Sequence, residues 1–471
     1  MESKKICDNI YEIPREGSMN VPGRVYASEE IFSAIQEDKT LTQARNVACL
    51  PGIISHSITL PDSHQGYGFP IGGVAAFDKE EGVISPGGVG YDINCSVRLL
   101  KTNLNKKDVL GNQNEIMNNL DEKIPSGVGR GSPFSLSKKQ FNEVLEKGAE
   151  WLVEKGYGRN EDLLKTEEEG CIGGADVSKV SERAVKRGIG QLGTIGSGNH
   201  FVDVLFVDET FDKKTAETFG LSEDQVVILI HCGSRGLGHQ IASDYMKAME
   251  QEYGFDNLPD RELICAPIKS QLGKEYYGAM CCAVNFAFAN KQLITHWIRS
   301  EMQKIFSGIK VGVVYDVSHN IAKFEKHLVN GEERTVCVHR KGATRSFGPG
   351  RDEIPEVYRH TGQPVLIPGS MGTPSYVMVG SEKSDELTFG SSVHGAGRVM
   401  SRSKAMKNIK GEDTKDTLQH DNIEVKSRSM KAISQESPQV YKNIEEVVSV
   451  VHDLDISKKV ARLKPLIVII G

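Results

Sequence analysis

The sequence predicts an α+β fold, because strand-like and helix-like stretches alternate without a regular strand–helix–strand rhythm. Short apolar runs typical of strands occur at 200–208, 226–230, 311–317 and 465–470. Amphipathic stretches typical of helices occur at 239–253 and about 282–306. Hydrophobic residues make up 38% and charged residues 25% of the 471, which indicates a globular chain with a substantial core.

The candidate site residues run from Asp62 to His394, so one shared site requires all of that chain to fold together. We therefore predict a single domain over 1–471, with mixed β-sheets flanked by helices. The polar, charged segment from about 101 to 187 is a candidate helical insertion. The polar stretch at about 410–439 is a candidate loop or lid.

Composition limits the class of protein. A formal charge of −6 gives no overall field toward nucleic acid, so any RNA contact requires a local basic patch. Nine cysteines without a C-x-x-C pair argue against a disulfide framework and favour a reducing compartment. The amino terminus lacks the apolar core of a signal peptide, and the run at 465–470 is too short to span a bilayer. We expect a cytoplasmic protein with no membrane segment.

Five residues predict a metal cluster. Asp92 and Cys95 follow a glycine-rich loop, and residues three apart can converge only at a turn. His200, His231 and His319 each lie at an end of a predicted strand, beside tight turns or glycines. Any one of these histidines is more often purely structural, but three in matching positions favour ligands. A thiolate with imidazoles suits Zn²⁺ or Fe²⁺, and residue types alone do not identify the metal.

His394 is the candidate nucleophile. The chain contains neither K-x-D-G nor G-x-x-x-x-G-K-[ST], so phosphates would be held by metals and glycine backbone. His394 precedes a stretch that we expect to be helical, and its imidazole can attack at neutral pH. On that expected helix, Arg398 and Arg402 would share one face suited to phosphates, unless they form an ordinary solvated face.

Two further segments carry basic residues. GSRGLG at 233–238 departs from the G-x-G-x-x-G pattern, so Arg235 is interpreted as a contact to an RNA phosphate rather than part of a dinucleotide loop. HRKGATR at 339–345 is a second candidate basic patch.

Several ordered motifs together resemble those of the RtcB RNA ligases. The blocks extend from about residue 20 to the C-terminus and read LPDSHQGYGFPIGG, SPGGVGYDINC, GSGNHF, GSRGLGHQ, YDVSHNIAKFE, HRKGAT, PGSMGT and HGAGR.

This resemblance implies one catalytic domain with a central metal and nucleotide cleft. It implies an enzyme that uses GTP and two Mn²⁺ ions to join 2′,3′-cyclic-phosphate or 3′-phosphate RNA ends to 5′-hydroxyl ends, in tRNA splicing or RNA repair. The substrates would be tRNA halves or damaged RNA, with an archease-like activator as a possible partner.

The resemblance also assigns roles to residues. Cys95 would bridge both metals, with Asp92 and His200 completing one site and His231 and His319 the other. His394 would become guanylylated. The residues expected around the nucleotide are Asn199, His200, Phe201, Val202, Asp203, His319, Asn320, Pro368, Gly369, Ser370, Met371, Ser375, His394, Gly395, Ala396, Gly397 and Tyr441. The candidate RNA contacts are Asp62, His64, Arg235, Arg398 and Arg402.

The chain departs from the family pattern at the nucleotide end. The family typically ends in V-I-K-G, where the lysine contacts the guanine nucleotide, and this chain has Ile470 at that position. Asp203 is one methylene shorter than the glutamate often found there. A metal-dependent RNA-end phosphoesterase with weak or altered nucleotide use is therefore the alternative function. A non-catalytic RNA-binding protein is a third, which the retained metal residues and His394 count against.

Overall fold

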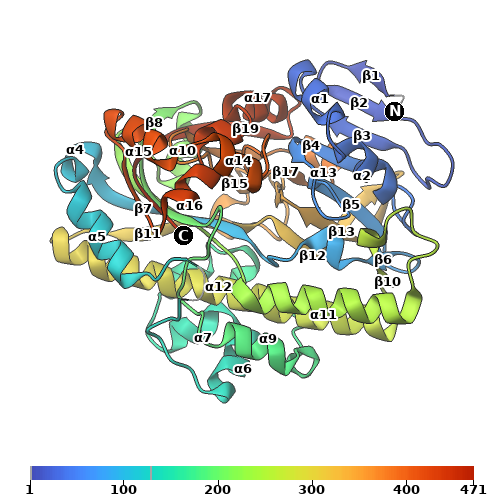
Figure 1. Ribbon diagram of the computed structural model, residues 1–471, viewed down its shortest axis with the longest axis horizontal. Helices are drawn as coiled ribbons and strands as arrows, with labels where there is room; N and C mark the ends of the chain where they lie inside the picture. The colour runs from blue at the N-terminus through green and yellow to red at the C-terminus, as the bar shows by residue number, and fades with distance from the viewer. Residues whose placement is uncertain (1–2, 128–129) are drawn as a thin grey trace.

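The structure, a computed structural model, describes residues 3–127 and 130–471 (Figure 1). It confirms the α+β class, since mixed β-sheets are packed against helices in one domain. Across these described ranges, no helix is long and apolar enough to cross a membrane.

The larger sheet carries the four strands that the sequence predicted. Its order is β11, β7, β9, β8, β19, β16 and β15, with β18 beside β19. The bounds are β11 Val311–Ser318, β7 Ser96–Asn105, β9 Gln225–Cys232, β8 Phe201–Thr210, β19 Ser457–Ile470, β16 Ser375–Gly380, β15 Pro364–Ile367 and β18 Glu424–Ser427. The predicted runs at 200–208, 226–230, 311–317 and 465–470 are therefore confirmed as strands.

A second sheet holds the N-terminal strands and a long hairpin. Its order is β1, β2, β3, β4, β5, β13 and β12. The bounds are β1 Lys4–Cys7, β2 Ile10–Ile13, β3 Gly23–Tyr26, β4 Ser57–His64, β5 Ile71–Asp78, β13 Glu332–Lys341 and β12 Asn320–Val329. Two short pairs are β6 Val83–Ile84 with β10 Ala266–Pro267, and β14 Ala343–Arg345 with β17 Ser391–Val393.

Two long helices, α11 and α12, lie along the lower side of the molecule in Figure 1. They span Arg235–Tyr253 and Gln271–Ile305, so both predicted helices are confirmed. The second begins earlier than predicted because the Ser270 side chain caps it by accepting from the Gly273 N–H.

Shorter helices surround the sheets. They are α1 Glu29–Gln36, α2 Thr40–Val47, α3 Pro86–Val89, α4 Lys106–Val109, α5 Gln113–Lys123, α6 Lys138–Lys147, α7 Ala149–Glu154, α8 Asn160–Leu163, α9 Glu182–Gly188, α10 Lys213–Phe219, α13 Glu382–Thr388, α14 Arg402–Asn408, α15 Gly411–His420, α16 Met430–Gln435 and α17 Ile444–Asp453.

The two polar segments both contain regular structure. The stretch 101–187 includes the end of β7 and helices α4 to α9. Residues 410–439 differ from the loop or lid that we predicted, because they contain α15, β18 and α16. Leu418 and Ile433 are buried there, and β18 pairs with β19, so a few apolar positions are enough to fix a mostly polar segment.

Antiparallel pairing brings one end of each of four neighbouring strands together on the same side of the larger sheet. The neighbours β11, β7, β9 and β8 alternate in direction, so the ends of β11 and β9 meet the starts of β7 and β8. Ser318 lies opposite Ser96, which in turn lies opposite Cys232. Phe201 lies opposite His231. All five metal candidates are in or beside these strand ends.

A buried ion pair holds two of these strands together behind those strand ends. Arg98 Nε on β7 lies 2.7 Å from Asp316 Oδ2 on β11, and neither side chain is exposed. Lys291 of α12 lies 3.4 Å from the other carboxylate oxygen. Because a buried charge without its partner is strongly unfavourable, this cluster ties β7, β11 and α12 into one unit.

We predict that Asp316→Ala lowers the free energy of unfolding by about 3–5 kcal/mol, since it leaves Arg98 and Lys291 buried without a counter-charge. Chemical denaturation followed by circular dichroism measures the loss. The matched control is Asp352→Ala, whose side chain is 97% exposed and lies 3.9 Å from Arg359. That change costs no more than about 0.5 kcal/mol. Equal losses in the two variants would contradict the role assigned to the buried pair.

Candidate active site

A tight turn brings Asp92 and Cys95 together just before β7. The Cys95 N–H donates to the Asp92 carbonyl at 2.9 Å, and Asn94 has a positive φ of 51°. Gly233 completes the fit, because a Cβ there would lie 2.5 Å from Asp92 Oδ1. The predicted convergence at a turn is confirmed.

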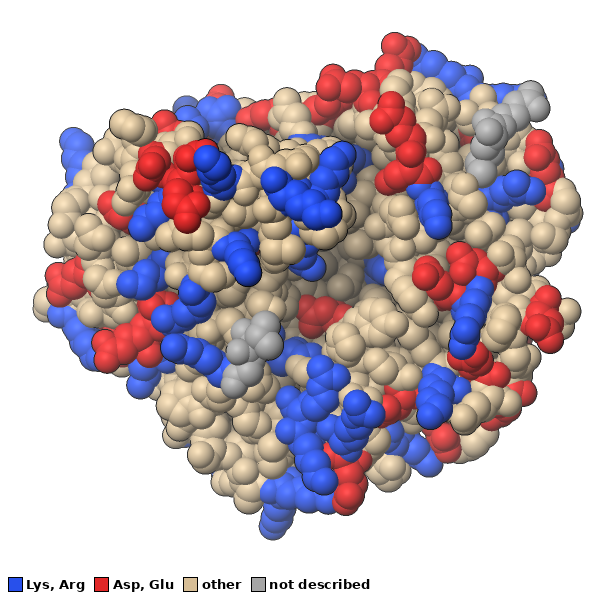
Figure 2. Space-filling model, in the orientation of Figure 1, with Lys and Arg blue, Asp and Glu red and all other residues tan. Residues whose placement is uncertain are grey.

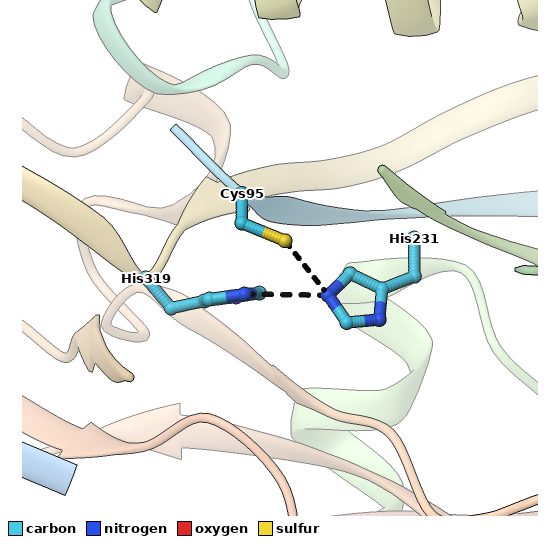
Figure 3. A group of neighbouring side chains, drawn as sticks. All are labelled: Cys95, His231 and His319. Atoms are coloured by element: carbon cyan, nitrogen blue, oxygen red, sulfur yellow. Dashed lines mark hydrogen bonds between the residues drawn. The ribbon is translucent and has the colours of Figure 1, made fainter. Parts of the chain in front are cut away.

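The three histidines meet Cys95 at the sheet edge. Cys95 Sγ lies 3.3 Å from His200 Nε2 and 3.2 Å from His231 Nε2. His231 Nε2 lies 3.3 Å from His319 Nε2, and Figure 3 shows both imidazoles directed at one another beside the thiol. Asp92 Oδ2 is 2.8 Å from His200 Nε2.

These atoms form two groups that share Cys95. One is Cys95 with His231 and His319, and the other is Cys95 with Asp92 and His200. Within each group the ligand atoms lie within 4.8 Å of one another. Ligands about 2.0–2.3 Å from a tetrahedral ion are separated by roughly 3.3–3.8 Å, so the spacing suits metal coordination.

Burial sets the protonation of the cluster. It lowers the pKa of His231 and His319 well below the ordinary value, with neighbouring histidines adding to the effect. Both rings are therefore neutral near neutral pH, which is the form that binds metals. Burial also raises the pKa of the Cys95 thiol, and Asp92 raises it further. Against the opposing effect of burial, His200 lowers the pKa of Asp92.

His394 faces this cluster from the end of the short β14–β17 pair. It follows β17, and its ring centroid lies 5.1 Å from that of His319. His394 Nδ1 is 2.6 Å from Asp62 Oδ2, and the same oxygen accepts from the His394 N–H at 2.9 Å. The carboxylate thus fixes the ring with Nδ1 protonated, which leaves Nε2 with its lone pair free to attack.

A cavity of about 1130 Å³ joins the metal candidates to His394. Most of the residues expected around the nucleotide line it: Asn199, Phe201, Asp203, His319, Asn320, Pro368, Gly369, Ser370, Met371, His394, Gly395, Ala396, Gly397 and Tyr441. The structure therefore brings together segments that are far apart in the sequence.

Three of the expected nucleotide residues, His200, Val202 and Ser375, lie outside the described cavity lining, and His200 belongs to the metal-candidate group instead. Val202 packs in the hydrophobic core, on the other face of β8 from Phe201 and Asp203. Ser375 supports the lining from behind, because its Oγ accepts from the Gly369 N–H at 3.0 Å. Side-chain alternation along β8 explains the position of Val202, and the buried, hydrogen-bonded hydroxyl explains that of Ser375.

Comparison with known proteins decides the family. A family model described as tRNA-splicing ligase RtcB matches residues 43–471. The chain belongs to the RtcB family. Relatives named tRNA-splicing ligase RtcB occur in Methanococcus maripaludis, 51% identical with 99% of each chain covered; in Thermococcus kodakarensis, 50% identical with 98% of each covered; and in Archaeoglobus fulgidus, 49% identical with 98% of each covered. The family predicted from the motifs is confirmed.

The cavity wall formed by β8 and β19 carries the two residues that we expected to affect nucleotide preference. Asp203 and Ile470 both line the cavity, as diagonal neighbours on one face of the β8–β19 pair. Asp203 is 6% exposed, and its Oδ1 has no hydrogen-bond partner in the described structure. Burial raises the pKa of Asp203 well above its usual range, which favours the neutral carboxylic acid.

Two candidate RNA contacts, Asp62 and Arg235, have other surroundings than predicted, whereas a third, His64, lines the cavity. Asp62 is fully buried against His394, so its carboxylate is not available to RNA. Arg235 is not part of the described cavity lining, and it donates to Thr194 Oγ1 at 3.1 Å and to Gln191 Oε1 at 3.3 Å. His64 does line the cavity, half-buried, with Nδ1 accepting from the Arg398 N–H at 3.3 Å.

Arg398 and Arg402 line the cavity but do not share a helix face. Helix α14 begins only at Arg402, so His394 and Arg398 precede it in irregular backbone, contrary to our prediction. The glycines after His394 delay the helix. Both arginines instead bind the buried Glu436, at 3.0 Å each, and the Tyr441 hydroxyl donates to the same carboxylate.

The basic run at 339–345 is not a surface patch. Arg340 is fully buried and forms two hydrogen bonds with Glu325. Arg345 is 1% exposed and bonds Glu168 at 3.0 Å. Lys341 lines the cavity, and burial lowers its pKa to about 7.

Sequence reasoning missed the partners of the functional side chains. It included Asp62 but not its role in orienting His394, placed Lys341 in a basic patch rather than in the cavity, and omitted Glu436. A buried acid that pairs with residues 30 or 300 positions away leaves no local periodicity, so no pattern in the sequence marks it.

Proposed function

We propose that this chain is an RNA ligase that joins 2′,3′-cyclic-phosphate or 3′-phosphate RNA ends to 5′-hydroxyl ends, using GTP and Mn²⁺. The observation that carries the proposal is the pairing of His394 with Asp62 beside the five-residue metal cluster. A pure binding protein needs neither an oriented imidazole nor a set of metal ligands.

In the first step His394 Nε2 attacks the α-phosphorus of GTP. A phosphorus–nitrogen bond forms, the bond to the β-phosphate oxygen breaks, and pyrophosphate leaves. Asp62 Oδ2 lies 2.6 Å from Nδ1 and accepts its hydrogen bond. The carboxylate also stabilises the positive charge that develops on the ring.

The cluster offers two divalent ions one carboxylate, one thiolate and three imidazoles. Cys95 would be shared, with Asp92 and His200 on one side and His231 and His319 on the other. The carboxylate is the ligand that suits Mn²⁺, whereas the thiolate and the imidazoles also suit softer ions. Metal ions held there would neutralise phosphate charge next to His394.

The later steps transfer the nucleotide and seal the RNA. A 2′,3′-cyclic phosphate is first hydrolysed, with water adding at phosphorus and the 2′-oxygen leaving as the hydroxyl. An oxygen of the resulting 3′-phosphate then attacks the guanylate phosphorus and releases His394. The 5′-hydroxyl oxygen then attacks the activated 3′-phosphorus, and GMP leaves. Arg398 and Arg402 at the cavity wall supply cations for these phosphates.

We predict that GTP carrying a radioactive α-phosphate labels the protein covalently in the presence of Mn²⁺, and that His394→Ala abolishes the label because it removes the attacking nitrogen. The label is measured by gel electrophoresis after denaturation. The matched control is His420→Ala, an exposed position at the end of α15, which keeps the label.

Labelling that survives His394→Ala would refute the histidine–guanylate step. The alternative, a metal-dependent phosphoesterase, is favoured by the apolar Ile470 in the cavity. It predicts that the protein opens cyclic-phosphate RNA ends with Mn²⁺ alone and joins none when GTP is added.

We predict that Ile470→Lys raises affinity for GTP relative to ATP by about tenfold or more, because the new ammonium would gain a charge-assisted hydrogen bond of about 1.5–3 kcal/mol beside Asp203. Competition between the two nucleotides in the labelling assay measures the ratio. Ile470→Met, which keeps the apolar volume, leaves the ratio unchanged. An unchanged ratio of GTP to ATP affinity in the lysine variant would show that this end of the cavity does not discriminate guanine from adenine.

The biological setting stays a prediction. Broken tRNA or damaged RNA as substrate, an archease-like activator and a cytoplasmic location follow from the family resemblance and from the reducing environment that the cysteines favour.

A further inference from the structure

Aromatic side chains lie together at one part of the cavity wall. Tyr67 and Tyr91 both line it, and Tyr91 directly precedes the metal candidate Asp92. The ring centroids of Tyr67 and Tyr91 are 5.5 Å apart with an edge-on contact. The Tyr91 ring stacks on His239 of α11 at 4.8 Å. We call these three residues the aromatic row.

The aromatic row is exposed but held in place. Tyr67 is 37% exposed, and His239 is exposed at the start of α11. Lys341 donates to the Tyr67 carbonyl, and the N–H of the next residue, Gly68, donates to Glu262 Oε2 at 2.8 Å. Burial lowers the pKa of His239, and Arg187 lowers it further, so its ring is neutral at physiological pH. Rigid, exposed aromatic rings are suited to stacking.

A basic surface continues from the aromatic row. Arg187 of α9 has its Nη1 3.4 Å from His239 Nδ1 and donates to Gln240 at 2.9 Å. Arg183 and Lys186 on the same helix are exposed. None of the three forms an ion pair with a carboxylate in the described ranges, whereas Lys138 of α6 is 3.5 Å from Glu182. Figure 2 shows basic side chains gathered below the central hollow, where α9 lies in Figure 1.

We propose that the aromatic row and the basic face of α9 bind a single-stranded RNA end and lead it to the metal cluster. This inference rests on the proposed function and adds the path of the substrate. Unpaired bases stack on aromatic rings while basic side chains follow the phosphates, and this combination is typical of surfaces that bind single strands. Paired bases in a duplex are already stacked on each other, so the row selects for an unpaired end.

The rim formed by α14 has charge without an exposed aromatic ring among the described residues, since Tyr441 beside it is half-buried and its hydroxyl donates to Glu436. Lys404 and Lys407 on α14 are exposed beside Arg402, and the exposed apolar side chains there are Val399 and Met406. That rim suits phosphates alone. The aromatic row therefore distinguishes the α9 side as the place where bases are contacted.

The test measures RNA binding by the full chain with fluorescence anisotropy. The probes are a single-stranded RNA of about six nucleotides, within the usual range for such sites, and a blunt RNA duplex. Tyr67→Leu and His239→Ala each weaken single-strand binding by about tenfold, the size expected for one lost stack. Duplex binding changes little. Substituting the Tyr67 side chain leaves the main-chain bond to Lys341 intact.

Charge is tested separately with Arg183→Ala/Lys186→Ala. The slope of log affinity against log salt concentration falls by about 1.4 for single-stranded RNA, since two phosphate contacts are lost. The matched controls lie on α11: Tyr253→Leu, which is 39% exposed, and the exposed Lys247→Ala. Tyr253 is 14 residues from His239, about 21 Å along the helix. Neither control changes binding.

Unchanged single-strand binding in Tyr67→Leu and His239→Ala would overturn the proposal, as would an equal loss for the duplex. Binding that falls in the charge variant but not in either aromatic variant would also overturn it, because an acidic protein or any polyanion would then fit the surface equally well. Covalent labelling with GTP requires no RNA. Variants that keep the covalent GTP label and lose single-strand binding support this RNA path. A wild-type chain that binds RNA but is never labelled by GTP contradicts the proposed ligase step and leaves the RNA path intact.

Discussion

The site depends on the antiparallel alternation of β11, β7, β9 and β8. Because adjacent strands run in opposite directions, two strand ends and two strand starts meet at one edge, and each contributes a candidate ligand. His319 lies where the chain passes from β11 in the larger sheet to β12 in the second sheet. The same residue therefore joins the cluster to the sheet that carries Asp62, and it lies beside His394.

Much of the fold was predictable from local patterns. The strands at β8, β9, β11 and β19 and the helices α11 and α12 were recognised from apolar periodicity, which is strong where one face or the whole element is buried. Residues 410–439 were predicted as a loop because their few apolar residues are diluted by charge. Their burial depends on the neighbouring β19, which lies elsewhere in the sequence.

The identities of the site residues were predicted better than the contacts that their side chains make. Asp92, Cys95 and the three histidines were found because each stands beside a glycine or a strand end, and the structure brings them together. Asp62 and Arg235 were expected to meet RNA, but long-range contacts with His394, Thr194 and Gln191 determine what they do. Such contacts depend on tertiary packing and leave no trace in residue spacing.

The central claim is that this sheet edge is a two-metal site that shares Cys95. Equilibrium dialysis against Mn²⁺, followed by metal analysis, tests it most directly when Cys95→Ser is compared with Cys232→Ser, the same change at a buried cysteine on the neighbouring strand. The account predicts two bound ions per chain in the wild type and in Cys232→Ser, and loss of both at the same free concentration in Cys95→Ser. Undiminished binding by Cys95→Ser would contradict it.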